Sequence, residues 1–199
     1  MAYVPRLTAP SSDDLRWIMV QGGGYNQCIA GSWPGGISNY PSVLPNCTGY
    51  VHGRCMELAN VTTDNLGLSF GNAVEYWTGC SSEWIQSSEP SLGAVIVYES
   101  IPGYGTAGHV AIVEEIIDAD TIVCSQSDYE IAYFTTYTLY RQYNWAPYPY
   151  PGYQVDCLGF LINPYISPEP TPTPTGTTGL LKKWYTCNAI SGKIRKRRL

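Results

Sequence analysis

The sequence has little charge, little histidine and no long apolar run. Only 14 % of the 199 residues are charged, and the chain has two histidines and three phenylalanines. So low a charge content argues against a nucleic-acid-binding protein. No stretch reaches the roughly 18 consecutive apolar residues of a membrane-spanning helix, so we expect no membrane insertion. A hydrophobic content of 44 % is nevertheless enough for a folded core.

The N-terminus and the cysteines both predict an intracellular origin. The first residues, MAYVPRLTAPSSDDLRW, lack the basic and apolar regions of a signal peptide, so we expect a chain without an export signal. Seven cysteines, an odd number, are scattered at positions 28, 47, 55, 80, 124, 157 and 187. At this length they do not predict a disulfide framework, and reduced thiols made in a cytoplasm are the simpler expectation.

Charge is distributed unevenly along the chain. Residues 1–165 hold four arginines and 15 acidic residues, so their net charge is 4 − 15 = −11, whereas the last 20 residues hold seven basic residues and no acid. Between them lies YISPEPTPTPTGTTG, in which proline alternates with small or polar residues, as is typical of an extended linker. The sequence therefore predicts a domain at residues 1–164, a linker at 165–179, and a basic tail or truncated second domain at 180–199.

The tail is too short to fold alone, since chains below about 40 residues usually need disulfides, metals or partners. Three interpretations remain open for it. It could attach the chain to anionic polymers, bind nucleic acid, or be a solvated remnant of an incomplete domain, and we favour the remnant.

The pattern within residues 1–164 predicts helices followed by strands. The stretch NCTGYVHGRCMELAN has apolar residues at helical spacing, and Asn46 is suited to cap a helix that begins at Cys47. A second, weaker helix is expected at Gly71–Trp77. From Leu92 the pattern changes to short β-rich runs, namely GAVIVY, HVAIVEEI, TIVCSQSDY and CLGFLI. We therefore expect an α+β fold in which N-terminal helices pack on a C-terminal antiparallel sheet.

Two histidines leave few places for acid–base chemistry. His52 lies in the predicted helix five positions after Cys47. About 140° of helix rotation separates their side chains, so they should not meet. His109 opens a predicted strand after the glycine-rich turn GYGTAG, which places its ring at the end of the sheet.

Cys47 is the candidate nucleophile because it starts a helix, where unpaired amides and the helix dipole favour a thiolate. A cysteine is more often a small buried hydrophobe, and that alternative stays open. A nucleophilic cysteine needs a base and a polar group that orients the base. His109 is the best base in the chain, and Gln126 and Asp128 are the groups that can orient it.

Four segments in this order, LPNCTGYVHGR, LGAVIVYES, GHVAIVEEI and SQSDY, resemble the CHAP domain. This cysteine- and histidine-dependent amidohydrolase/peptidase module occurs in phage lysins and bacterial wall hydrolases. The resemblance runs from Gly22 to Pro164, with 62 positions from Cys47 to His109 and 17 from His109 to Gln126. It implies a papain-like fold, with Cys47 as the nucleophile and His109 as the general base.

The third catalytic position departs from the family. The family commonly has an acid-x-Asn motif there, and this chain has Gln126-Ser127-Asp128. Gln126 can accept a hydrogen bond from the imidazole, as Asn does in papain-like enzymes, but it carries no charge. Asp128 lies on the same face of the strand and can supply that charge, so both residues stay candidates. The helix N-terminal amides, together with the Asn46 side chain, are the expected oxyanion donors.

The resemblance implies a peptidoglycan hydrolase without a cofactor. The bond cut is that of an N-acetylmuramoyl-L-alanine amidase or of a stem-peptide or cross-bridge endopeptidase, as in an endolysin made in a host cytoplasm and released to the wall. In such lysins a wall-binding domain follows a linker of this kind. Gln126 prompts an alternative, a catalytically inactive wall-binding or structural module, and an acyltransferase of the same plan also fits the residues.

Aromatic side chains are the candidate substrate contacts: Trp77, Trp84, Tyr129 and Trp145. They could stack on sugars or peptides along a groove, although ordinary packing explains each ring equally well. Some relatives hold calcium in an acidic loop near the nucleophile. Because no acid lies between Arg16 and Cys47, and because Asp118-Ala119-Asp120 lacks the carboxylate spacing of an EF-hand loop, we predict no metal site.

Overall fold

The computed structural model describes residues 3–11, 13–31, 41–100, 106–147 and 155–166. The chain divides into two units, Met1–Ser167 and Pro168–Leu199. The second unit, which holds most of the predicted linker and the whole basic tail, lies outside the described residues. The predicted domain boundaries therefore stay predictions.

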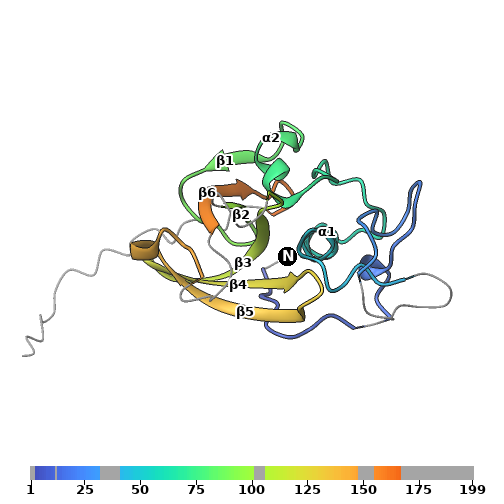
Figure 1. Ribbon diagram of the computed structural model, residues 1–199, viewed down its shortest axis with the longest axis horizontal. Coiled ribbons are helices and arrows are strands. Elements are labelled where there is room, and N and C mark those ends of the chain that lie inside the picture. Colours follow the sequence, from blue (N-terminus) through green and yellow to red (C-terminus); the bar gives the residue numbers. More distant parts are fainter. Residues whose placement is uncertain (1–2, 12, 32–40, 101–105, 148–154, 167–199) are drawn as a thin grey trace, which may run out of the picture. The chain divides into compact units, whose positions relative to one another are not determined.

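The described part of the chain is built on one antiparallel sheet of six strands (Figure 1). The strands are arranged in the order β1-β6-β2-β3-β4-β5. Their bounds are β1 (Ile85–Ser87), β2 (Val95–Ser100), β3 (His109–Asp118), β4 (Thr121–Asp128), β5 (Ala132–Tyr140) and β6 (Val155–Ile162). Short helical turns occur at η1 (Leu15–Trp17), η2 (Ala73–Glu75), α2 (Tyr76–Gly79) and η3 (Arg141–Tyr143).

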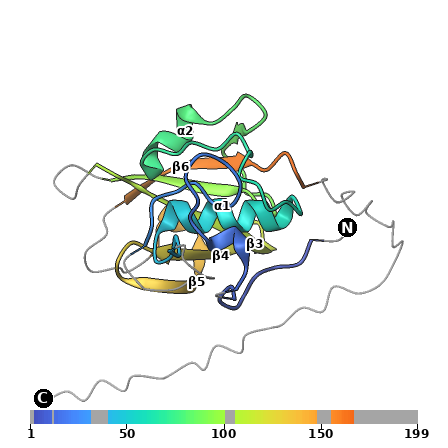
Figure 2. The ribbon, with the colours of Figure 1, turned by 90° about the vertical axis from the view of Figure 1, so that its right-hand side faces the viewer.

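Helix α1 (Cys47–Leu58) lies across one face of this sheet (Figure 2). Its start is fixed by Asn46, whose side-chain oxygen accepts hydrogen bonds from the amides of Thr48 and Gly49. Its buried face includes Tyr50, Val51 and Met56, which pack against Val110 and Ile112 of β3 within one apolar cluster. This packing holds the first residue of α1, Cys47, at the end of the sheet.

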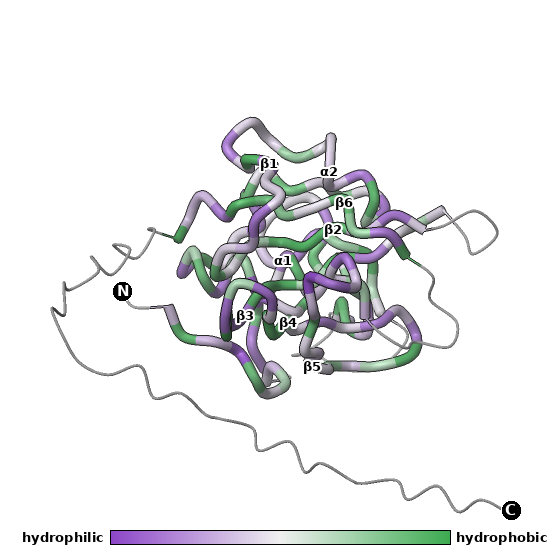
Figure 3. Tube along the Cα trace, turned by 90° about the vertical axis from the view of Figure 1, so that its left-hand side faces the viewer, coloured by the Kyte–Doolittle hydropathy of each residue, from purple (hydrophilic) through white to green (hydrophobic). Residues whose placement is uncertain are grey.

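The sheet separates two apolar clusters, one on each face. The first contains α1 and side chains such as Val95, Val97 and Ile112. The second lies on the opposite face and contains Ile96 and Trp145. Successive buried side chains of β2 point alternately into the first and the second cluster, because side chains alternate between the two faces of a strand. Figure 3 shows the hydrophobic character of this central strand. No helix in the described part of the chain has the length and apolar character needed to cross a membrane.

A buried ion pair ties α1 to the sheet. Arg54 of α1 is 3 % exposed and donates to Glu114 of β3, which is 1 % exposed, across 2.8 Å. The same carboxylate accepts hydrogen bonds from the Tyr3 hydroxyl at 2.6 Å and from the Ser125 hydroxyl, also at 2.6 Å. The N-terminal segment, α1, β3 and β4 therefore meet at one carboxylate, and each of its partners lowers the cost of burying it.

The structure confirms the predicted fold class and corrects parts of the predicted element list. The predicted helix after Asn46 is confirmed, as are the four predicted strands, which became β2, β3, β4 and β6. The continuous helix expected at Gly71–Trp77 is wrong, because the chain there forms the turn η2 and the single-turn helix α2. Strands β1 and β5 are additional to the prediction. The six cysteines in the described residues are free.

Candidate active site

The first residue of α1, Cys47, is half-buried at the end of the sheet. The segment before it is held to β4, because the Asn46 amide donates to the Ser127 hydroxyl at 3.0 Å. Thr48 and Gly49 donate their amides to the Asn46 side chain, and Tyr50 donates its amide to the Asn46 carbonyl. Among the described residues the Cys47 amide has no hydrogen-bond partner, so it can donate to an oxygen that develops charge beside the thiol.

This arrangement gives Asn46 a capping role. Its Oδ1 atom accepts the capping hydrogen bonds, so only its Nδ2 group could donate to an oxyanion, and that role stays a prediction. These capping bonds also use the backbone amides of Thr48 and Gly49, two of the helix amides that were expected to donate to an oxyanion. The Cys47 amide is thus the backbone donor that remains available at the helix start, and the Asn46 cap helps to position it.

The first residue of β3, His109, lies next to Cys47 and is 6 % exposed. It pairs with Tyr98 of β2, and the two rings stack with their centroids 6.1 Å apart. Gly108, directly before it, has φ = +70°, and a Cβ there would collide with the Tyr98 carbonyl oxygen. A glycine is therefore required to bring His109 to this position.

Gln126 and Asp128, near the end of β4, complete the cluster. Nε2 of His109 donates to Oε1 of Gln126 at 2.9 Å. Nε2 of Gln126 in turn donates to both carboxylate oxygens of Asp128, at 3.0 and 3.1 Å. Asp128 is also close to the imidazole, with 3.8 Å between its Oδ1 and Nε2 of His109. The two orienting candidates therefore act in series, with the amide in contact with His109 and the carboxylate behind it.

The surroundings of His109 favour its protonated form. Burial alone lowers the pKa of this imidazole, but a hydrogen bond with Cys47 and the charges of Cys47 and Asp128 outweigh burial and raise the pKa to about 9. Because Nε2 of His109 is hydrogen-bonded to Gln126, the hydrogen bond of this ring with Cys47 must involve Nδ1. The cluster thus has the order thiol, imidazole, amide, carboxylate, which suits transfer of the thiol proton to the imidazole.

The second histidine, His52, belongs to a separate cluster. Its ring is fully buried, with Nδ1 2.8 Å from the Asp64 carboxylate and Nε2 3.0 Å from the Ser69 carbonyl. Phe70 stacks on it with a centroid separation of 4.9 Å. Its hydrogen bonds are therefore directed to the loop that follows α1 and to Cys28, and not to the Cys47 site.

The four candidate aromatic rings have different environments. Trp84 is 4 % exposed and donates to the Leu66 carbonyl at 2.8 Å. Trp145, also 4 % exposed, lies in the apolar cluster on the face opposite α1. Rings so deeply buried serve the core and are not presented to a substrate, which corrects the expectation for these two residues. Trp77 is half-buried against Gly159 of β6.

Tyr129 is the one of the four that is both exposed and adjacent to the cluster. It follows Asp128 directly and is 46 % exposed. The next residue, Glu130, donates its amide to the Pro45 carbonyl at 3.4 Å, which brings this turn beside the segment that leads to Cys47.

The sequence did not identify Tyr98 as part of the site, because the strand register that places it against His109 is not visible in the sequence.

No group of three or more His, Cys, Asp or Glu side chains in the described residues is arranged to hold a metal ion. The chemistry that the Cys47 cluster supports with its own residues is acyl transfer. A thiol beside a buried, oriented imidazole, with a free backbone amide at the helix start, provides a nucleophile, a proton carrier and an oxyanion donor.

Comparison with known proteins found one family model and solved structures that resemble parts of this chain. Residues 37–128 match the family model of the CHAP domain, a range that includes Cys47, His109, Gln126 and Asp128. No curated protein matches the chain. Among solved structures, an N-acetylmuramoyl-L-alanine amidase from Staphylococcus aureus matches with 26 % identity and a TM-score of 0.36. That match covers 50 % of this chain and 28 % of the amidase chain.

Proposed function

Because residues 37–128 match the family model of the CHAP domain, we propose that the protein is a cysteine-dependent peptidoglycan hydrolase. The observation that carries the proposal is the continuous hydrogen-bonded series from Cys47 through His109 and Gln126 to Asp128. Such a series supplies an activated thiol and an oriented proton carrier. Its substrate is an amide bond of the bacterial wall, in the link to muramic acid or in the peptide.

The reaction proceeds in two acyl-transfer steps. The Cys47 thiolate attacks the amide carbonyl carbon, and the Cys47 amide donates to the resulting oxyanion. The His109 imidazolium gives its proton to the leaving nitrogen, so that the C–N bond breaks and a thioester remains on Cys47. Water then loses a proton to His109 and attacks the thioester, which releases a carboxylic acid and regenerates the thiol.

One feature favours a second candidate, an inactive wall-binding module. Gln126 is uncharged at a position where the family commonly has an acid. The carboxylate of Asp128 behind it answers this objection, because it lies 3.8 Å from the imidazole and its charge helps to raise the pKa of His109. We therefore favour the hydrolase.

The test is the release of soluble fragments from purified peptidoglycan by the full chain. Cys47→Ala should lower the rate at least about 10³-fold, because it removes the nucleophile. Cys157→Ser is the matched control, since Cys157 is half-buried as Cys47 is but lies on β6. Thermal melting confirms that both variants are folded. Release of fragments by Cys47→Ala at the wild-type rate would overturn the cysteine mechanism.

Mass spectrometry of the fragments then identifies the bond. A new amino terminus on alanine, together with a free carboxylate on muramic acid, indicates an amidase, whereas a new amino terminus within the stem or cross-bridge indicates an endopeptidase. Binding to peptidoglycan without any fragment release by the wild-type chain would support the inactive module instead.

A further inference from the structure

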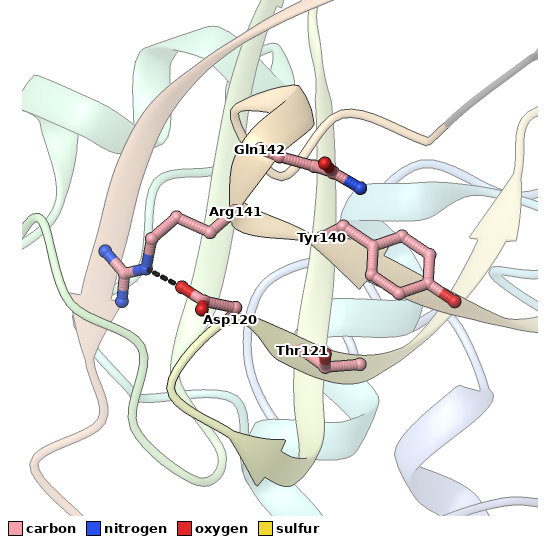
Figure 4. Close-up of a pocket in the computed structure, with 5 residues that line it drawn as sticks. All are labelled: Asp120, Thr121, Tyr140, Arg141 and Gln142. Carbon is pink, nitrogen blue, oxygen red and sulfur yellow. Dashed lines mark ion pairs between the residues drawn. The ribbon is translucent and has the colours of Figure 1, made fainter. Parts of the chain in front are cut away.

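An open pocket lies where β4 begins, at the opposite end of this strand from the Cys47 cluster. Its volume is about 460 Å³, and it is lined by Asp120, Thr121, Tyr140, Arg141 and Gln142 (Figure 4). Thr121 begins β4 and Asp128 ends it. Seven residue steps at the rise of a strand correspond to about 23 Å, so this pocket is separate from the Cys47 cluster.

The pocket combines an aromatic ring with polar side chains. Tyr140 is 42 % exposed and lies opposite Thr121 in the strand register. Figure 4 shows the Tyr140 ring, the Gln142 amide and the Thr121 side chain extending to the same side. The rings of Tyr140 and Tyr143 meet edge to face, with centroids 6.3 Å apart. An exposed ring beside hydroxyl and amide groups matches the two kinds of surface on a sugar, an apolar C–H face and a polar rim.

The polar surface continues along the edge strand. Thr136 and Thr138 are exposed, and they lie on the same face of β5 as Tyr140 because side chains alternate along a strand. β5 is the last strand of the sheet, so its outer edge has no neighbouring strand among the described residues. A row of threonine hydroxyls thus leads away from the pocket, which suits a ligand longer than one sugar ring.

Charge excludes an anionic ligand. Arg141 is engaged by Glu89 at 2.7 Å and by Asp120 at 3.3 Å, and it lies 4.9 Å from the Trp145 ring centroid. The other three arginines of the described residues are also paired with carboxylates: Arg6 with Glu57, Arg16 with Asp14 and Arg54 with Glu114. An anionic wall polymer or a nucleic acid therefore finds no unpaired cation at this pocket.

We propose that the Tyr140 pocket is a second, non-catalytic subsite that binds a neutral N-acetylated glycan. The Tyr140 ring stacks on the apolar face of one sugar, and the Gln142 amide and Thr121 hydroxyl bind its polar groups. The choice of an N-acetylated sugar rests on the proposed function, because that is the glycan of the polymer that a peptidoglycan hydrolase cuts. The subsite would hold the glycan chain of the wall while Cys47 attacks an amide bond elsewhere in the same polymer.

The test is a titration of the full chain with the trisaccharide of N-acetylglucosamine, followed by heteronuclear NMR. We expect shifts at the backbone amides of residues 120–121 and 140–142. Tyr140→Ala should weaken binding about tenfold, because it removes the stacking ring, while Tyr140→Phe should stay within about twofold of the wild type. No binding, shifts confined to the Cys47 cluster, or equal affinity of Tyr140→Ala and the wild type would overturn the subsite.

A second measurement separates this proposal from the proposed function. Tyr140→Ala should hydrolyse a small soluble muropeptide at the wild-type rate and intact peptidoglycan several-fold more slowly, since only the polymer reaches both sites. Trisaccharide binding that depends on Tyr140 supports the subsite even if the wild type hydrolyses nothing. Hydrolysis by a wild-type chain that does not bind the trisaccharide leaves the proposed function standing and removes the subsite.

Discussion

The carbonyl oxygen of Gln126 accepts a hydrogen bond from Nε2 of His109 across 2.9 Å. Asp128 fixes this orientation of the amide, because an ionised carboxylate can only accept and therefore draws the NH₂ group of Gln126 toward itself. The oxygen of the amide must then face His109, which keeps a proton on Nε2 and leaves Nδ1 for Cys47. An uncharged glutamine thus does the orienting work of an acid with the help of the carboxylate behind it.

The variant Asp128→Asn tests this relay. Asn can donate as well as accept, so the Gln126 amide loses its single orientation, and the imidazolium loses a nearby negative charge. We expect kcat on a soluble muropeptide to fall about 10- to 100-fold with little change in KM. Asp156→Asn, which changes an exposed carboxylate on β6, is the control. Equal kcat values for the two variants would show that Asp128 has no positioning role.

Exchanging the two groups gives a sharper test. Gln126→Glu places two carboxylates side by side, and their repulsion should lower kcat. The double variant Gln126→Glu/Asp128→Asn restores one acid and one amide, now with the acid in contact with His109. We expect the double variant to be more active than either single one, a non-additivity that a double-mutant cycle measures. Additive losses would mean that the two residues act independently.

In the proposed reaction the pKa of His109 sets the alkaline limit of activity. Burial lowers this pKa, but the contact with Cys47 and the charge of Asp128 raise it to about 9. The imidazolium that the proposed reaction needs to protonate the leaving group is therefore present below pH 9 and is lost above it. We expect the rate of hydrolysis to fall as the pH rises through about 9, and the fall to begin at lower pH in Asp128→Asn. An alkaline limb that is unchanged in Asp128→Asn would contradict the assignment.

The sequence was most informative where one residue type determines a local structure. Asn46 before an apolar helical repeat located the start of α1, and the β-rich runs located four strands. Strand β5 was missed because its sequence, AYFTTYTLY, mixes aromatic residues and threonines on both faces, so no apolar alternation reveals it. The helix expected at Gly71–Trp77 failed because tertiary contacts overrode a weak pattern, such as the bond from the Val74 amide to the Ala107 carbonyl.

Within the site, spacing and resemblance identified residues but not their arrangement. Cys47 and His109 are 62 positions apart in the chain, and only the packing of α1 on the sheet brings them together. Whether Gln126 or Asp128 orients the imidazole also could not be decided, because the direction of an amide depends on partners in space. The burial of Trp84 and Trp145 was equally invisible, since an aromatic residue suits a core and a groove alike.

Thiol reactivity distinguishes an active cysteine from a buried one. Cys80 and Cys157 are half-buried as Cys47 is, and burial raises the pKa of both, that of Cys157 to about 11. Cys47 instead has an imidazole partner. At pH 7 iodoacetamide should modify Cys47 at least about tenfold faster than either of the others, as measured by mass spectrometry of each peptide. His109→Ala should remove this advantage, and equal rates in the wild type would contradict an activated thiol.

His52 should make the stability of the folded chain depend on pH. Burial alone lowers the pKa of this ring, but the charge of Cys28 and the hydrogen bond to Asp64 raise it to about 10. The folded pKa thus exceeds the unfolded value of about 6.5. The stabilisation is therefore complete below that pH and is lost as the pH rises toward 10. Asp64→Asn leaves a buried charge without its partner and should cost about 3 kcal/mol of unfolding free energy at pH 6.

The matched control for this variant is Asp14→Asn, which alters the partly exposed pair of Asp14 with Arg16 and should cost less than about 1 kcal/mol. Urea unfolding at pH 6 and pH 9.5 measures both variants against the wild type. The deficit of Asp64→Asn should shrink at the higher pH, because the wild type itself then begins to lose the imidazolium. A deficit that is the same at both pH values, or no larger than that of Asp14→Asn, would mean that His52 is buried as a neutral ring.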